Sequence, residues 1–294
     1  VKDIKNFIKK IKKNEYDLED SYCLSALIKE IGKLRYSVEV SIRFFNNLIS
    51  IITPMYNGGK FIEKTIKSVK SQTITNWEMI IVDDGSKDNC SEKVMYFAKN
   101  DSRFKLIRQP NGGSANARNN GLRNAKGKYI CFLDADDLWE SNFLETQLSF
   151  LKKNNYALVF SSYKRINESG NEILQPFIVP EKINYNNLLK TCSISCLTAL
   201  YDKQVVGDLF FDERMHSLRD DLVFWLQILK KIDFAYGNKV VLASYRVFNT
   251  STTGSKLKVI KPQFKVYYEV EKLGIVKSFF YTIHWAVRGF LKYK

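Results

Sequence analysis

Three aspartates directly follow an apolar segment in the stretch YICFLDADDLW, residues 129–139. Asp134, Asp136 and Asp137 lie so close together that their charges repel unless a cation lies among them. Carboxylate oxygens without His or Cys nearby favour Mg²⁺ or Mn²⁺, and such ions usually also bind phosphate oxygens of a substrate. The stretch therefore predicts a divalent cation that bridges to a diphosphate. The alternative is that Asp136 or Asp137 only caps a helix beginning near Leu138.

Other polar residues that could bind a nucleotide follow two earlier apolar segments. Asp83 and Asp84 come after MIIV, where a carboxylate can accept hydrogen bonds from a base imide or a ribose hydroxyl. Tyr56 can stack on a base or fill the edge of a sheet. Arg118 follows NGGS near the start of a predicted helix, and the N-terminus of a helix favours anions. Arg118 is therefore predicted to reach a phosphate, with a surface salt bridge as the alternative.

The elements that must position these residues alternate between apolar segments and helical patterns. Strands are predicted at 48–53, 78–82, 104–108 and 128–133, with helices at 57–72, 88–100 and 114–125. This order predicts βαβ units, so we expect an α/β fold with a mostly parallel central sheet and helices on both faces. Ligands of such sheets bind beyond the carboxyl ends of the strands, where the polar residues above are predicted to converge.

The second half of the chain has a looser pattern. A helix is predicted at 141–153, strands at 156–160 and 163–167, a helix beginning at Asp220 and a strand at 239–248. The stretch from about 175 to 215 is predicted to be irregular. We expect this half to continue the same sheet and to bind the acceptor.

Net charge and its location indicate a partner at a membrane surface. The chain of 294 residues has a net charge of +15, and residues 256–294 hold nine Lys or Arg against two Glu. The segment KSFFYTIHWAVRGFLKYK in this basic amphipathic tail suits either a helix in the headgroup layer of an anionic membrane or one docked on the domain by its apolar face. Without a spanning segment or an aromatic-basic motif for nucleic acid, the chain is predicted to be cytoplasmic and peripheral at the inner face of the cell membrane.

At this point the motifs resemble a known family. The series SIITPMYNGGKFIEKTIKSVKSQT, WEMIIVDDGSKD and NGGSANARNNGLRNAKGKYICFLDADD is similar to the family 2 glycosyltransferases of the GT-A fold, of the bacterial surface-polysaccharide type. The match runs from Ile49 to Leu138, with weaker signals to about 255. The resemblance implies a nucleotide-sugar donor, most often a UDP-sugar, with Tyr56 and Asp84 meeting the base and Asp83 close by.

The resemblance also implies roles for the remaining residues. Asp134 would lie near the ribose or sugar, and Asp136 would bind Mn²⁺ or Mg²⁺. In LRDDLVFWL, Asp221 holds the position of the family's catalytic base and Asp220 replaces a glutamate, although Asp220 could instead form a capping box with Ser217. Pro54 and Arg118 complete the implied donor site, with possible support from Asp220 and Arg246.

The implied enzyme is an inverting, metal-dependent hexosyl- or N-acetylhexosaminyltransferase. Its predicted acceptor is a hydroxyl of a saccharide, preferably lipid-linked, in O-antigen-like or capsule-like polysaccharide synthesis. The predicted domains are a helical N-terminal extension (1–47) that either binds a membrane or forms a homodimer, a GT-A domain (48–255) with donor (48–140) and acceptor (141–255) halves, and the tail. Two alternatives are a nucleotide-sugar-binding protein without turnover and a phosphoaspartate phosphatase, since ICFLDADD resembles the start of that enzyme class.

Overall fold

The computed structural model describes residues 29, 32–33, 47–215, 218–248 and 256–291. The chain separates into two compact units, Val1–Asn46 and Asn47–Lys294, and the elements below all belong to the second. The predicted N-terminal extension lies almost entirely outside the described residues.

Four parallel strands form the first half of the sheet, as the sequence predicts. They are ordered β3-β2-β1-β4 in space, with bounds β1 (Ile49–Met55), β2 (Trp77–Asp83), β3 (Phe104–Arg108) and β4 (Tyr129–Phe132). The helices between them are α3 (Ile62–Lys70), α4 (Cys90–Asn100) and α5 (Ser114–Asn124). Met55 and Asp83 are partners in the register, so the carboxyl ends of β1 and β2 lie side by side.

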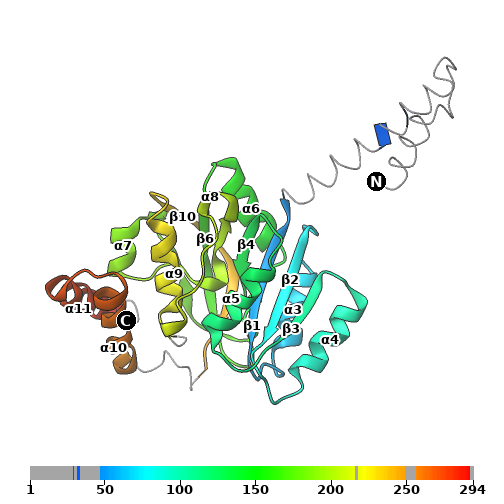
Figure 1. Cartoon of the computed structure of the whole chain (residues 1–294), viewed down its shortest axis with the longest axis horizontal. Helices are drawn as coiled ribbons and strands as arrows, with labels where there is room; N and C mark the ends of the chain where they lie inside the picture. The colour runs from blue at the N-terminus through cyan, green and yellow to red at the C-terminus, as the bar shows by residue number, and fades with distance from the viewer. Residues whose placement is uncertain (1–28, 30–31, 34–46, 216–217, 249–255, 292–294) are drawn as a thin grey trace, which may run out of the picture. The chain divides into compact units, whose positions relative to one another are not determined.

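The strands are buried on both faces because successive side chains point to opposite sides of the sheet. Ile52 and Phe132 belong to the core cluster on one side, and Ile51 and Cys131 to the cluster on the other. Figure 1 shows α5 and α9 on one side of these strands and α3 and α4 on the other. The helix α5 lies close to β1, because a Cβ added at Gly121 would lie 2.4 Å from the Ile52 side chain. This small-residue contact fixes the helix that carries Arg118.

The second half continues the same sheet with mixed directions. Beyond β4 the order is β9-β6-β10-β5, with bounds β9 (Leu200–Asp202), β6 (Leu158–Ile166), β10 (Ala235–Arg246) and β5 (Leu138–Trp139). The strand β9 is antiparallel to its neighbours β4 and β6, whereas β6 and β10 are parallel to each other. At its margin, β7 (Glu172–Phe177) pairs with β6 and β8 (Lys182–Ile183) pairs with β10. The predicted α/β fold with a largely parallel sheet is confirmed.

Three expectations for the second half are wrong. The predicted strands 156–160 and 163–167 are one strand, β6, because Ser161 and Ser162 are buried between neighbouring strands rather than in a turn. No helix begins near Leu138, where β5 pairs with β10, and α6 (Phe143–Lys153) follows. The stretch predicted to be irregular contains β9, α7 (Tyr185–Lys190) and α8 (Lys203–Val206). These elements are too short to produce a clear periodic pattern.

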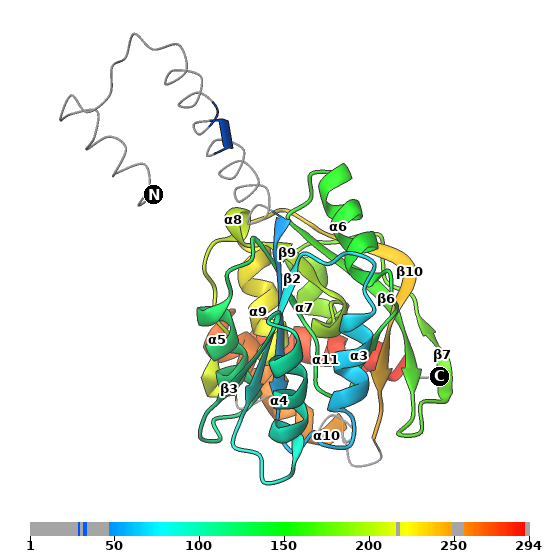
Figure 2. The ribbon, with the colours of Figure 1, turned by 90° about the vertical axis from the view of Figure 1, so that its right-hand side faces the viewer.

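The C-terminal segment is docked against α7 and α9 (Asp220–Leu229). It consists of α10 (Lys256–Lys265), a π-helical turn (Val266–Val270) and α11 (Ile275–Leu291). The Tyr267 hydroxyl donates to the Leu189 carbonyl, and the buried Glu271 forms an ion pair with Lys230 of 2.7 Å. Figure 1 places α10 and α11 on the opposite side of the domain from β3, so α11 lies behind the sheet in the view of Figure 2. Within the described residues, none of these helices is long and apolar enough to cross a bilayer.

Candidate active site

The acidic turn follows β4 and is not part of a strand. The Asp137 N–H donates to the Asp134 carbonyl at 3.2 Å, which closes the turn. The Thr65 hydroxyl of α3 contacts the carbonyls of Ala135 and Asp137, both at 2.9 Å. The side chains of Asp134 and Asp136 are partly exposed, whereas Asp137 is buried. The turn therefore presents two of its three carboxylates to solvent.

Asp137 anchors the turn to β10. One of its carboxylate oxygens accepts the N–H of Arg246 at 2.7 Å, and the other has no hydrogen-bond partner among the described residues. Burial, together with the charges of Asp136 and Asp134, raises the pKa of Asp137 well above its usual value. The idea that Asp137 caps a helix is wrong, because α6 begins only after Asn142.

Arg246, at the end of β10, holds the acidic turn through hydrogen bonds. Its Nε donates to the Asp136 carbonyl at 2.8 Å, and its Nη1 donates to the carbonyls of Asn167 and Glu168 at 2.8 and 3.1 Å. The guanidinium lies 4.6 Å from the centre of the Phe61 ring. Arg246 thus joins the acidic turn to the loop between β6 and β7. Its predicted supporting role for catalysis stays a prediction, but these contacts give that role a physical basis.

The carboxylate of Asp136 has an environment suited to a cation. Burial and the charge of Asp134 raise the pKa of Asp136 to about 6. The positive charge of Arg246 and the backbone N–H of Asp136 itself oppose this shift in pKa without cancelling it. The described residues contain no group of three or more His, Cys, Asp or Glu arranged as a complete metal site. A site with the Asp136 carboxylate as its protein ligand fits Mg²⁺ or Mn²⁺, because these ions need few protein ligands when a substrate supplies the others.

Arg118 connects the acidic turn to the first residues of α9. Its Nη2 donates to Asp134 Oδ1 at 2.8 Å, and its Nη1 donates to Asp220 Oδ2 at 3.0 Å. The side chain is buried, with its guanidinium 5.4 Å from the centre of the Phe211 ring. Burial alone would lower the pKa of Arg118, but the two carboxylates outweigh it and raise that pKa. The sequence predicts a phosphate contact for Arg118, and the structure brings it to two carboxylates of the protein.

Asp221 lies at the start of α9 beside this ion pair. The helix is preceded by Arg219 in the left-handed region, with a φ of 69°, and the Leu222 N–H donates to Asp221 Oδ1 at 2.7 Å. Burial and the charge of Asp220 raise the pKa of Asp221. A raised pKa makes this carboxylate a stronger base. The alternative capping box of Asp220 involves Ser217, which lies outside the described residues.

Asp84 holds the loop that precedes α5. The N–H groups of Gly112 and Gly113 donate to its two carboxylate oxygens, both at 2.8 Å, and the Gln109 amide donates to Oδ1 at 2.8 Å. The Asn111 amide donates to the Asp84 carbonyl at 2.9 Å. The sequence did not single out Gln109 or Asn111, although both lie in the polar stretch QPNGGS. The predicted contact between Asp84 and a base stays a prediction.

The other predicted donor-site residues lie at the ends of β1 and β2. The Asp83 carboxylate accepts hydrogen bonds from Ser86 and from the Ser91 hydroxyl. Burial by itself raises the pKa of Asp83, but these hydrogen bonds outweigh it and lower that pKa. Pro54 lies within β1, and the Tyr56 side chain just beyond it is 53% exposed. The exposed ring is open to stacking, as the sequence predicts.

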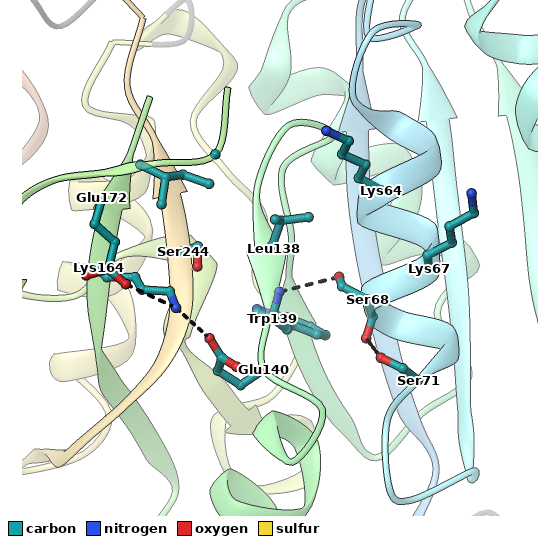
Figure 3. Close-up of a pocket in the computed structure, with 12 residues that line it drawn as sticks. Lys64, Lys67, Ser68, Ser71, Leu138, Trp139, Glu140, Lys164, Glu172 and Ser244 are labelled. Atoms are coloured by element: carbon teal, nitrogen blue, oxygen red, sulfur yellow. Dashed lines mark hydrogen bonds and ion pairs between the residues drawn. The ribbon is translucent and has the colours of Figure 1, made fainter. Parts of the chain in front are cut away.

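A separate pocket of about 490 Å³ lies between α3 and the strands β5 and β10 (Figure 3). Lys164 in its wall is matched by Glu140 and Glu172, at 3.1 and 3.4 Å. None of the predicted site residues is among its described lining residues. The pocket therefore has a lining distinct from the predicted site residues, although its residue Leu138 directly follows the acidic turn.

Comparison with known proteins decides the family. A family model described as Glycosyl transferase family 2 matches residues 50–210. The chain belongs to this family. It is a glycosyltransferase, so the alternatives of a phosphatase and of a binding protein without turnover are set aside.

Curated relatives support the same family over most of their length. The Escherichia coli protein WfgD, named as a UDP-Glc:α-D-GlcNAc-diphosphoundecaprenol β-1,3-glucosyltransferase, is 38% identical over 248 residues, covering 84% of this chain and 95% of the relative. TuaG of Bacillus subtilis, whose name assigns it provisionally to teichuronic acid biosynthesis, is 37% identical over 242 residues, covering 81% and 94%.

Solved structures with the same fold include two nucleotide-sugar complexes. Staphylococcus aureus TarS 1–349 with UDP-GlcNAc has a TM-score of 0.61 at 20% identity, covering 76% of this chain and 66% of that one. A Pyrobaculum calidifontis mannosyltransferase with GDP-Man and Mn²⁺ has a TM-score of 0.58 at 18% identity, covering 77% and 65%. The predicted GT-A fold is therefore confirmed.

Proposed function

We propose that this glycosyltransferase moves a sugar from a UDP-sugar to a hydroxyl of a lipid-linked saccharide, with inversion at the anomeric carbon, in the synthesis of a bacterial surface polysaccharide. The donor and acceptor follow from the names of the relatives: a UDP-sugar and a diphosphoundecaprenol-linked saccharide for WfgD, and teichuronic acid for TuaG. The residue roles below rest on the geometry of this chain.

The single observation that carries the proposal is the contact of Arg118 with Asp134 and Asp220. Asp134 follows β4 in the donor half, and Asp220 begins α9 in the acceptor half. Because Asp221 is the next residue of that helix, the ion pair brings the candidate base to the edge of the sheet where the donor is expected to bind. The arrangement suits a reaction between two substrates that enter from different halves.

The chain's own residues can perform the transfer in one displacement. Asp221 accepts the proton of the acceptor hydroxyl while that oxygen forms a bond to the anomeric carbon. The bond from the anomeric carbon to the diphosphate oxygen breaks, and UDP leaves with the electron pair. Attack opposite the leaving group inverts the configuration and needs no covalent intermediate. Tyr56 and Asp84 are proposed to meet the base.

Mn²⁺ or Mg²⁺ is proposed to bind at Asp136, with Asp134 on the sugar or ribose side. When bound, such an ion neutralises the charge that develops on a departing diphosphate. The chain positions this site through the Arg246 contact with the Asp136 carbonyl and through the Arg118 contact with Asp134.

Asp136→Asn should be at least as stable as the parent without metal and less stable than the parent when metal is bound. The pKa of Asp136 is raised from 3.8 to about 6, so in the folded protein the charged form is disfavoured and stability falls as pH rises through this range. Without metal, Asp136→Asn should therefore melt no lower than the parent at neutral pH, and any gain should vanish below pH 3.8. With Mn²⁺ the parent alone should be stabilised.

Thermal unfolding with and without Mn²⁺ measures both effects. Asp208→Asn is the matched control, because that side chain is 72% exposed and forms a surface ion pair with Lys203. Equal stabilisation of the parent and of Asp136→Asn by Mn²⁺ would show that Asp136 does not bind the metal.

The donor can be identified by stabilisation against heat. A ligand at 100 times its Kd stabilises the folded state by about 2.7 kcal/mol, and about 1 kcal/mol raises Tm by roughly 2–4 °C in a domain of this size. A panel of UDP-, GDP-, CDP- and dTDP-sugars with Mn²⁺ should therefore raise Tm by several degrees for the true donor, and we expect a UDP-sugar. Assaying UDP release from that donor then tests turnover. A panel that leaves Tm unchanged, together with no release of nucleotide, would overturn the proposed function.

A further inference from the structure

The helix α11 is oriented with its apolar side away from the protein. Val276 and Ile283 are 79% and 62% exposed. Four more side chains on the helix are also more than half exposed: Ile275, Phe279, Phe280 and Val287. Among the described side chains of α11 the buried ones are instead Ser278 and Thr282, whose hydroxyls donate to the carbonyls of Gly274, just before the helix, and of Ser278. A surface helix of a soluble domain normally buries its apolar side, whereas α11 exposes its apolar side and buries small polar residues.

This orientation is fixed by contacts on the inner side of the helix. Tyr281 packs against Tyr267, with ring centres 5.7 Å apart, and Tyr267 is itself bound to Leu189. The Glu271 carboxylate, just before α11, is held by Lys230 and by the Tyr185 hydroxyl. The exposed apolar face is therefore a result of how the segment docks on α7 and α9. The sequence left open whether this segment meets a membrane or docks by its apolar face, and within the described residues it docks by the other face.

The charges near this face favour an anionic partner. The two acidic residues of the segment, Glu269 and Glu271, are paired with Lys265 and Lys230. Lys272, shortly before α11, and Lys277, in its first turn, are exposed and have no ion-pair partner among the described residues. The helix itself contains no Asp or Glu. A second copy of this face, or the basic segment VKDIKNFIKKIKK of this chain, would bring like charges together.

We propose that the outer face of α11 binds the surface of an anionic lipid bilayer, and thereby holds the active site next to lipid-linked acceptor. Exposed aromatic and aliphatic side chains flanked by lysines suit the boundary between headgroups and acyl chains. The inner face of the same helix lies near the start of α9, because the Arg219 guanidinium lies 4.7 Å from the centre of the Trp285 ring. Arg219 immediately precedes Asp220 and Asp221, so the membrane-facing helix and the proposed base are neighbours. The acceptor part of this inference rests on the proposed function.

The test is co-sedimentation of the whole chain with vesicles. The parent should bind vesicles of phosphatidylcholine with added phosphatidylglycerol, and bind pure phosphatidylcholine more weakly. Replacing Val276 and Ile283 together by Gln should weaken binding by roughly tenfold or more, because two apolar side chains lose their transfer into the bilayer. The matched control replaces Ile173 and Val240 by Gln, since these side chains are 42% and 52% exposed on β7 and β10. The control should bind like the parent.

Three results would overturn the inference. The parent could remain in the supernatant with anionic vesicles, or V276Q/I283Q could bind as the parent does, which would assign binding to another segment. Light scattering could instead show a dimer that V276Q/I283Q dissociates, which would make a second copy the partner.

The failure of the proposed function gives a different result. If the parent binds vesicles but releases no nucleotide from any nucleotide-sugar, the membrane face stands and the proposed reaction does not. If the parent releases UDP with Mn²⁺ but does not bind vesicles, only the inference about the membrane face is wrong. If both the membrane face and the proposed reaction are correct, V276Q/I283Q should still hydrolyse the UDP-sugar with water as acceptor. It should no longer transfer the sugar to an acceptor embedded in vesicles.

Discussion

Asp221→Asn should lower kcat by about 10²–10⁴-fold, the range expected when a general base is removed. The amide keeps the shape of the side chain and can still accept the Leu222 N–H, so the start of α9 should remain folded. Because the residue is proposed to act on the acceptor hydroxyl, binding of the UDP-sugar should not change. The measurements are initial rates of transfer and the Tm shift with the donor.

The pH dependence provides a second readout of the same residue. Burial and Asp220 raise the pKa of Asp221, and a base must be deprotonated to work. Activity should therefore fall with decreasing pH at a higher pH than an ordinary carboxylate would give, and this acidic limb should disappear in Asp221→Asn. Asp233→Asn, an exposed aspartate beyond the other end of α9, should leave both rate and profile unchanged. A rate for Asp221→Asn within a few-fold of the parent would exclude Asp221 as the base.

The sequence predicts the donor half of the fold well because its signals are local. Each apolar segment in this half, such as 78–82, is a strand whose polar residues follow at its carboxyl end. In a parallel sheet these ends must meet, so their convergence could be predicted before any contact was known. The register of Met55 with Asp83 agrees with this expectation.

The roles of individual charges could not be predicted in the same way, because they depend on contacts between distant residues. The Arg118 partner Asp220 lies 102 positions away, and the Asp137 partner Arg246 lies 109 positions away. Local spacing suggested a phosphate for Arg118 and a helix cap for Asp137. Periodicity also fails for α11, because a helical pattern predicts an apolar side without predicting which way that side faces.

The buried position of Arg118 predicts the largest loss of stability in the site. Arg118→Met should lower the free energy of unfolding by about 3–5 kcal/mol, because removing one partner of a buried ion pair leaves the other charges uncompensated. Asp134 and Asp220 would both lose their cation. The exposed Arg123 on the same helix is the matched control: its pair with Glu213 spans 3.9 Å at the surface, so Arg123→Met should change stability by less than about 1 kcal/mol. Urea unfolding at neutral pH measures both variants.

A double variant separates charge from packing in this prediction. If the loss in Arg118→Met comes from uncompensated carboxylates, adding Asp220→Asn should recover part of the stability, although Asp220→Asn alone should destabilise the parent by removing the negative charge from the 3.0 Å contact. If the loss came only from the missing guanidinium contacts with Phe211, the two changes would add. The recovered protein should still transfer sugar poorly, because the ion pair that joins the acidic turn to the start of α9 is absent. Recovery of both stability and activity would show that Arg118 only balances charge and does not position Asp221.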